Sequence, residues 1–123
     1  MWYPLIGVRL HGWLDDLVVA TYIVGARVLG LSGTALTMAL LAAAVHFLLT
    51  RFTDYPQGTW RVIRFSQHAY IELGEGIAVL LGTLLLLQTA PVTTRIFLTL
   101  MGASQLIAFA FSDYGQGRAA PKP

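Results

Sequence analysis

The chain has 123 residues, of which 56% are hydrophobic and only 11% are charged, with a formal net charge of +2 and no cysteine. A soluble domain carries roughly a quarter charged residues, so this composition excludes an ordinary water-exposed surface and indicates a protein surrounded by lipid. The basic residues form no run, which argues against nucleic-acid binding. The lack of cysteine excludes disulfides, thiolate metal sites and thiol catalysis.

Four apolar segments follow one another along the chain, each close to the roughly 20 residues that cross a bilayer as a helix. We predict spans over residues 11–31, 34–52, 69–88 and 93–111. The first span contains Asp15, Asp16 and Arg27, which must lie near the interfaces if the segment crosses. Tight turns after the first and third spans, and a longer loop over 53–66, predict an all-α membrane protein made of two helical hairpins.

The ends and loops predict an orientation. Six basic residues fall on the side of the termini and the long loop, and two fall on the other side: Arg9, Arg51, Arg61, Arg64, Arg118 and Lys122 against Arg27 and Arg95. The positive-inside rule then places both termini in the cytoplasm, and we expect a multi-pass protein of a bacterial inner membrane. The start of the chain lacks the pattern of a cleaved signal peptide. Residues 115–123, rich in Gly, Pro and Ala, predict a disordered tail.

The two halves of the chain resemble each other. The segment His11-Gly-Trp-Leu-Asp15 aligns with His68-Ala-Tyr-Ile-Glu72, and Phe52–Gly58 aligns with Phe111–Gly117 at five identities in seven positions. We therefore predict one transmembrane domain, 1–123, built from a repeat over 10–58 and a second over 67–117. Because each repeat holds two spans, both insert the same way up, as a parallel internal repeat.

A His-x3-acid start, a hairpin turn, a second span ending in Thr-Asp-Tyr and then a second His-x3-acid start resemble the SPW-repeat family of small bacterial membrane proteins. The resemblance covers residues 10–117. The namesake Ser-Pro-Trp tripeptide is absent, since the corresponding stretches read Val24-Gly-Ala-Arg-Val28 and Leu81-Gly-Thr-Leu84. The resemblance implies the four-helix architecture and no particular activity.

Ionisable residues gather at one predicted end of the bundle. His11 and Asp15 share a helix face, as do His68 and Glu72. The full candidate cluster is His11, Asp15, Asp54, His68, Glu72, Glu75 and Asp113. Glu75 stands apart because its counterpart in the first repeat is Val18. A second interior polar pair is predicted from His46 and its counterpart Gln105, which we expect to face each other across the bundle.

Four interpretations of this cluster remain open. It is a structural clasp between hairpins, favoured by acids near helix starts; a divalent-metal site of mixed His and carboxylate ligands; a bis-histidine haem site using His11 and His68; or a proton or ion pathway. The sequence does not identify a cofactor or a metal. We expect a non-enzymatic accessory or scaffolding subunit of a larger membrane complex, or a homo-oligomer, with a transport module or a haem- or metal-binding bundle as the alternatives. The expected partners are the lipid bilayer and other membrane subunits or a second copy, and no nucleic acid.

Overall fold

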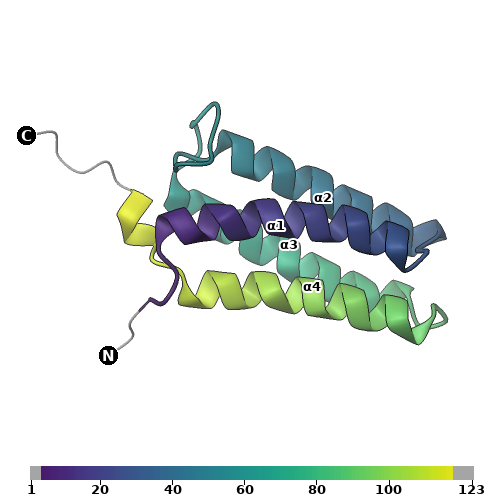
Figure 1. The fold of residues 1–123 in the computed structure, drawn as a ribbon. Helices are drawn as coiled ribbons and strands as arrows, with labels where there is room; N and C mark the ends of the chain where they lie inside the picture. Colours follow the sequence, from purple (N-terminus) through teal and green to yellow (C-terminus); the bar gives the residue numbers. More distant parts are fainter. Residues whose placement is uncertain (1–3, 118–123) are drawn as a thin grey trace, which may run out of the picture.

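The computed structural model describes residues 4–117, which form an all-helical bundle (Figure 1). Its four long helices are α1 (Val8–Val28), α2 (Gly33–Phe52), α3 (Phe65–Leu86) and α4 (Val92–Phe111), followed by a short 3₁₀ helix, η1 (Tyr114–Gly117). The predicted all-α class and the order of the four helices are therefore confirmed.

The helices pack as two close antiparallel pairs. α1 lies against α2 and α3 lies against α4, while α2 with α3 and α1 with α4 make the weaker contacts that join the pairs. α1 and α3 consequently face each other across a diagonal of the bundle (Figure 1). The loop 53–64, the segment before α1 and η1 all lie at one end, called the polar end below.

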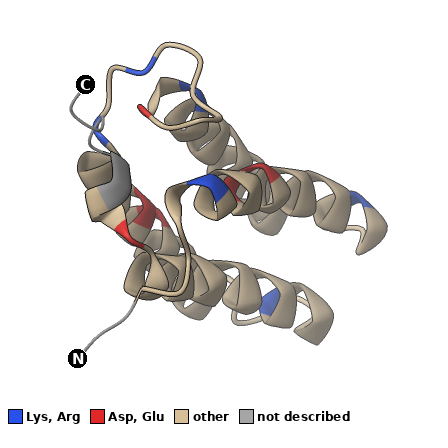
Figure 2. Ribbon diagram, turned by 60° about the vertical axis from the view of Figure 1, so that its left-hand side comes forward, with Lys and Arg blue, Asp and Glu red and all other residues tan. Residues whose placement is uncertain are grey.

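Three helices in the described part of the chain, α2, α3 and α4, are long and apolar enough to cross a membrane. α1 is of similar length but carries four charged residues, Arg9, Asp15, Asp16 and Arg27. Large apolar side chains are exposed on all four helices, for example Val28 at 75% and Leu84 at 66%. This outward apolar surface fits lipid rather than water. Acidic residues lie toward the polar end, and basic ones lie at both ends (Figure 2).

The helix limits differ from the predicted spans by a few residues. α1 covers Val8–Val28 where 11–31 was predicted, because Gly30 adopts a positive φ of 64° and ends the helix. The backbone N–H groups of Gly30 and Leu31 donate to the carbonyls of Arg27 and Ala26, the pattern typical of a glycine-terminated helix. The predicted disordered tail also differs, since its first residues belong to η1. Residues 118–123 lie outside the described part.

Short backbone pairings close the polar end. Ile6 pairs with Ser112, and Thr53 pairs with Ile63, as isolated parallel bridges. The N–H of Asp113 donates to Ile6 at 2.9 Å, and the N–H of Asp54 donates to Ile63 at 2.8 Å. The segment before α1 is thus hydrogen-bonded to the chain just after α4, and the segment before α3 is hydrogen-bonded to the chain just after α2. These pairings set the depth of the side chains at the start of α1 and α3.

Candidate metal centre

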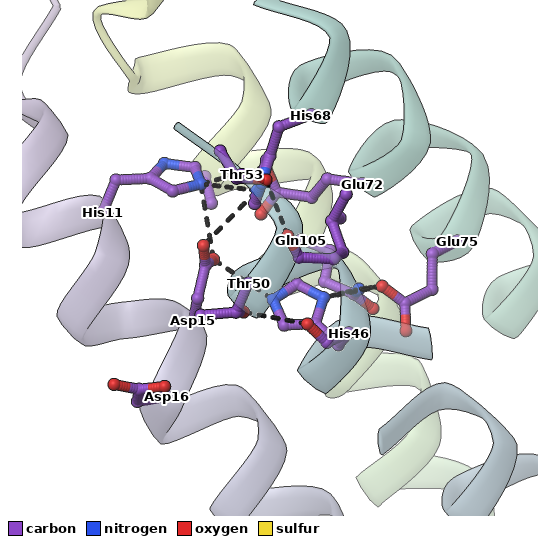
Figure 3. Close-up of polar contacts among 12 residues, drawn as sticks. His11, Asp15, Asp16, His46, Thr50, Thr53, His68, Glu72, Glu75 and Gln105 are labelled. Atoms are coloured by element: carbon purple, nitrogen blue, oxygen red, sulfur yellow. Dashed lines mark hydrogen bonds and ion pairs between the residues drawn. The ribbon is translucent and has the colours of Figure 1, made fainter. Parts of the chain in front are cut away.

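A group of buried polar side chains occupies the bundle interior near the polar end (Figure 3). Every helix contributes to it: His11 and Asp15 from α1, His46 from α2, His68, Glu72 and Glu75 from α3, and Gln105 from α4. Glu75 is 9% exposed, and the other six are at most 1% exposed. Burying so many ionisable groups is costly unless each finds partners, so their contacts decide what the cluster can do.

Four of these side chains converge on one point between the diagonal helices. The Nε2 atoms of His11 and His68 lie 3.2 Å apart. His11 Nε2 lies 3.3 Å from Asp15 Oδ1 and 3.3 Å from Glu72 Oε2. His68 Nε2 lies 3.3 Å from Asp15 Oδ2 and 3.8 Å from Glu72 Oε2. Each of the four residues can offer one ligand atom such that all four lie within 4.8 Å of one another.

Two hydroxyl groups determine which ring nitrogen of each histidine carries the hydrogen. Thr53 Oγ1 donates to the carbonyl of Leu49 at 2.6 Å and lies 2.9 Å from His68 Nδ1. A hydroxyl has one hydrogen, so Thr53 must accept from His68 Nδ1–H. In neutral His68, Nε2 then carries a free lone pair that faces the convergence point.

The same arrangement recurs at the other histidine. Ser112 Oγ donates to the carbonyl of Ala108 at 2.6 Å and lies 2.6 Å from His11 Nδ1. His11 Nδ1–H therefore donates to Ser112, and in neutral His11 the Nε2 lone pair also faces inward. A histidine that binds a metal usually donates its other ring N–H to such an outer partner, which fixes the tautomer.

Two tyrosines hold the carboxylates. Tyr55 OH donates to Asp15 Oδ2 at 2.6 Å, and Tyr114 OH donates to Glu72 Oε2 at 3.1 Å. Burial raises the pKa of both phenol groups, and the nearby carboxylates raise it further. Both phenols therefore remain hydrogen-bond donors at neutral pH, which favours ionised carboxylates as acceptors.

Phe65 closes the centre toward the polar end. Its side chain is 1% exposed, and its ring centroid lies 5.0 Å from His11 and 5.6 Å from His68. Tyr55 and Tyr114 flank it at 5.5 Å and 4.8 Å. These rings cover both histidines, so the centre has a low local dielectric in which its electrostatic interactions are strong.

His46 connects the centre to Glu75, deeper in the bundle. His46 Nε2 lies 3.1 Å from Asp15 Oδ1, and its Nδ1 lies 2.6 Å from Glu75 Oε2 (Figure 3). Both nitrogens face carboxyl oxygens, so a doubly protonated ring would donate to both. Gln105 Nε2 donates to Glu75 Oε2 at 2.6 Å, and Tyr22 OH donates to Gln105 Oε1 at 2.9 Å.

Three carboxyl groups, those of Asp15, Glu72 and Glu75, share this buried space with three imidazole rings. The inward Nε2 atoms of His11 and His68 lie 3.2 Å apart, so a proton or another cation between them removes the repulsion between their lone pairs. A divalent cation at this point would also offset the negative charge of ionised carboxylates.

The structure brings together most, but not all, of the residues that the sequence singled out. His46 and Gln105 face each other, with 3.3 Å between His46 Nδ1 and Gln105 Nε2, and share the network with the main cluster. Asp54 is exposed, and Asp113 accepts from the backbone N–H of Gly115, so neither carboxylate joins the network. Outside it, Asp16 forms an ion pair with Arg51.

Sequence reasoning missed five contributors to the network: Thr53, Tyr55, Ser112, Tyr114 and Tyr22. The first four lie in the repeated Phe-Thr-Asp-Tyr and Phe-Ser-Asp-Tyr segments, so the repeat itself contained the signal. The helical spacing of His46 and Thr50 also places them on one face of α2, which Thr53 directly follows.

The bis-histidine haem interpretation conflicts with these distances. An iron in line between two imidazoles needs two metal–nitrogen bonds of about 2 Å each, which separates the nitrogens by about 4 Å. Here the Nε2 atoms are 3.2 Å apart, and carboxylate oxygens at 3.3 Å occupy the space that a porphyrin would need. A small cation fits where a macrocycle does not.

No protein-family model, curated protein or solved structure matches this chain. The resemblance to the SPW-repeat family therefore stays a prediction, and the function is argued from the geometry alone.

Proposed function

We propose that this protein is a non-enzymatic membrane bundle that binds one divalent transition-metal ion through His11, Asp15, His68 and Glu72. The observation that carries the proposal is the pair of inward-facing Nε2 atoms, 3.2 Å apart, with a carboxylate oxygen 3.3 Å from each. Two imidazole nitrogens and two carboxylates facing one point favour a cation between them.

The spacing of the four side chains agrees with tetrahedral coordination. When four ligand atoms lie about 2.0–2.1 Å from a zinc ion, the edges of their tetrahedron are about 3.3–3.4 Å. Five nitrogen–nitrogen and nitrogen–oxygen separations in the cluster fall between 3.2 and 3.8 Å, two of them to different oxygens of Asp15. With one ligand atom per residue the separations extend to 4.8 Å, so an ion would draw the four side chains slightly together. A ligand set of imidazole and carboxylate without sulfur suits Zn²⁺, Fe²⁺ and Mn²⁺.

The enclosure of the site supports a structural role for the metal. Catalytic zinc sites keep a coordination position open, whereas structural sites are filled by four protein ligands. Here two ligands come from α1 and two from α3, which lie on a diagonal of the bundle and pack little against each other directly. A bound ion would join the two hairpins where side-chain packing alone does least.

The contacts at the polar end support four spans and an internal duplication. Under the predicted repeat, the pairing of Ile6 with Ser112 is equivalent to the pairing of Ile63 with Thr53. The bond between His11 and Ser112 is equivalent in the same way to the bond between His68 and Thr53. The pairing of Ile6 with Ser112 supports a crossing α1, because it brings the start of α1 to the depth at which α4 ends. We keep the cytoplasmic placement of this end, and the role as a subunit of a larger bacterial inner-membrane assembly or homo-oligomer, as parts of the proposal.

Metal content of the purified protein tests the central claim. The protein is purified in detergent with a histidine-free affinity tag, and its metals are measured by mass spectrometry. We expect about one divalent ion per chain, whose X-ray absorption spectrum reports four nitrogen or oxygen neighbours at about 2.0–2.1 Å. Replacement of one ligand, His68→Ala, should release the ion.

Asp54→Asn provides the matched control, because Asp54 lies next to Thr53 in the chain but its carboxylate is exposed. This variant should keep the wild-type metal content. A wild-type protein that takes up no Zn²⁺, Fe²⁺ or Mn²⁺, even after reloading, would contradict the proposal.

The path from Asp15 through His46 to Glu75 favours a second candidate, a proton pathway. The two carboxylates on either side of one imidazole ring could pass a proton inward. On this view Glu75→Gln changes proton flux in proteoliposomes, whereas Val18→Ala, at the corresponding position of the first half, does not. Equal flux through wild type, both variants and empty liposomes would remove this candidate.

A further inference from the structure

An apolar groove runs between α2 and α3, on the outer surface of the bundle. It has a volume of about 420 Å³, and its lining is Met38, Leu41, Ala42, Val45, Ile71, Gly74, Glu75, Ala78 and Val79. Leu41 is 61% exposed and Val45 is 45% exposed, so the groove opens on the lipid-facing surface. Its size is within the range of pockets that hold small organic ligands.

Glu75 is the only ionisable residue that lines this groove, and half of its carboxylate lacks a partner. Oε2 lies within hydrogen-bond distance of His46 and accepts from Gln105, whereas Oε1 has no hydrogen bond among the described residues and is covered by neighbouring atoms, so a donor reaches it only when the carboxyl group turns toward the groove. Figure 3 shows Oε1 turned away from the network. A buried carboxylate oxygen without a donor is costly, so a donor from outside the described residues would stabilise it.

Gly74 borders the groove without a structural reason to be glycine. A Cβ at this position would meet nothing within 4 Å, and the residue lies inside α3 with no positive φ. By contrast, a Cβ at Gly76 would lie 3.1 Å from the carbonyl oxygen of Gly102 on α4. Glycine inside a helix costs roughly 0.5–1 kcal/mol relative to alanine, so Gly74 weakens α3 and leaves open space beside Glu75.

We propose that this groove binds a neutral, lipid-soluble molecule that carries a hydroxyl group. The carboxyl group of Glu75 turns so that Oε1 accepts from the hydroxyl, and the apolar body lies against α2 and α3. Gly74 and Glu75 lie about ten residues into α3, roughly 15 Å along the helix axis, which is near the middle of a bilayer. The ligand therefore enters from the lipid and not from water.

The lining of the groove selects a neutral ligand over a cation. Apart from Glu75 the lining is apolar, and a charged ligand would lose its hydration there. The groove, the unpaired oxygen and the open space at Gly74 do not depend on the proposed metal.

Photolabelling tests the proposal. The probe is an alkylphenol with a diazirine in its chain, and its methyl ether is the matched compound without a donor. Full-length protein in phosphatidylcholine nanodiscs is irradiated with each probe, and labelled peptides are mapped by mass spectrometry. We expect the phenol to label α2 and α3 about tenfold more than the ether does, the effect of one hydrogen bond to a charged acceptor.

Gly74→Leu fills the groove and should abolish this selective labelling, while its metal content stays at the wild-type level. Ala110→Leu places the same side chain at an exposed position on α4 and should label like the wild type. Equal labelling by phenol and ether, or selective labelling that persists in Gly74→Leu, would overturn the proposal. Selective phenol labelling of a metal-free wild type would support the groove and contradict the metal centre, so the two failures are distinguishable.

Discussion

Tyr55 and Tyr114 hold the two carboxylates of the proposed metal centre, so their hydroxyl groups should affect metal affinity without touching the ion. Loss of one outer-shell partner typically lowers metal affinity about 10–100-fold. We expect Tyr55→Phe and Tyr114→Phe each to weaken Zn²⁺ binding by a factor in this range, measured by competition with a chelating dye. Tyr70→Phe is the control, because Tyr70 is 72% exposed, and it should bind like the wild type. Unchanged affinity in both inner variants would show that these phenols do not support the metal.

The residue scale also shows why the sequence identified the cluster only in part. Helical spacing correctly grouped His11 with Asp15 and His68 with Glu72. Asp54 was misplaced because α2 ends at Phe52 and Thr53 is extended, with ψ of 140°. Side chains alternate along extended backbone, so Thr53 and Tyr55 point inward and Asp54 points outward. Assigning charged residues to the cluster from their position in the sequence alone could not show which side chains point inward.

The contrast between Gly74 and Gly76 leads to a prediction at the scale of the helix. A Cβ at Gly76 would lie 2.5 Å from Leu106 Cδ1 and 3.1 Å from the carbonyl oxygen of Gly102, where α3 and α4 approach closely. Gly76→Ala should therefore destabilise the bundle by about 1–3 kcal/mol, the usual cost of overpacking. Gly74→Ala should instead stabilise it by roughly 0.5–1 kcal/mol through helix propensity.

Unfolding of both variants by sodium dodecyl sulfate, from mixed micelles and followed by circular dichroism, measures this difference. Equal midpoints for the two variants would show that the close approach of α3 and α4 at Gly76 contributes nothing to stability.

Hydropathy located the helices well but placed the ends of α1 and α3 a few residues too late. Apolar composition reports which residues lie in lipid, whereas helix ends depend on backbone hydrogen bonds. α3 begins at Phe65 rather than residue 69, and the backbone N–H of Arg64 donates to Gln67 Oε1 at its start. The first turns of α1 and α3 contain polar residues, so hydropathy left them out of the predicted spans although they are helical. This is why the histidines near the start of each helix face the interior at the same depth.

For the whole molecule, the proposed crossing of α1 can be tested because the chain has no native cysteine. Single cysteines at Leu5, Ser32 and Thr59 are exposed to a membrane-impermeant maleimide from either side of right-side-out or inverted vesicles. We expect Leu5→Cys and Thr59→Cys to react from the same side and Ser32→Cys from the opposite side. Reaction of Leu5→Cys on the side of Ser32→Cys would show that only α2, α3 and α4 cross.

Metal removal should weaken the whole bundle, because the proposed ion joins α1 to α3 across the diagonal. A ligand that binds only the folded state adds about 2.7 kcal/mol of stability at a free concentration of 100 times its Kd. We expect a chelator to lower the thermal midpoint of the wild type and added Zn²⁺ to restore it, while His68→Ala has a lower midpoint that responds to neither. The stabilisation by Zn²⁺ should also shrink as the pH falls, because His11 and His68 bind the ion only through free Nε2 lone pairs and protons compete for them. A wild-type midpoint that is independent of metal would mean that side-chain packing and the Thr53, Ser112, Tyr55 and Tyr114 bonds hold the diagonal helices without an ion.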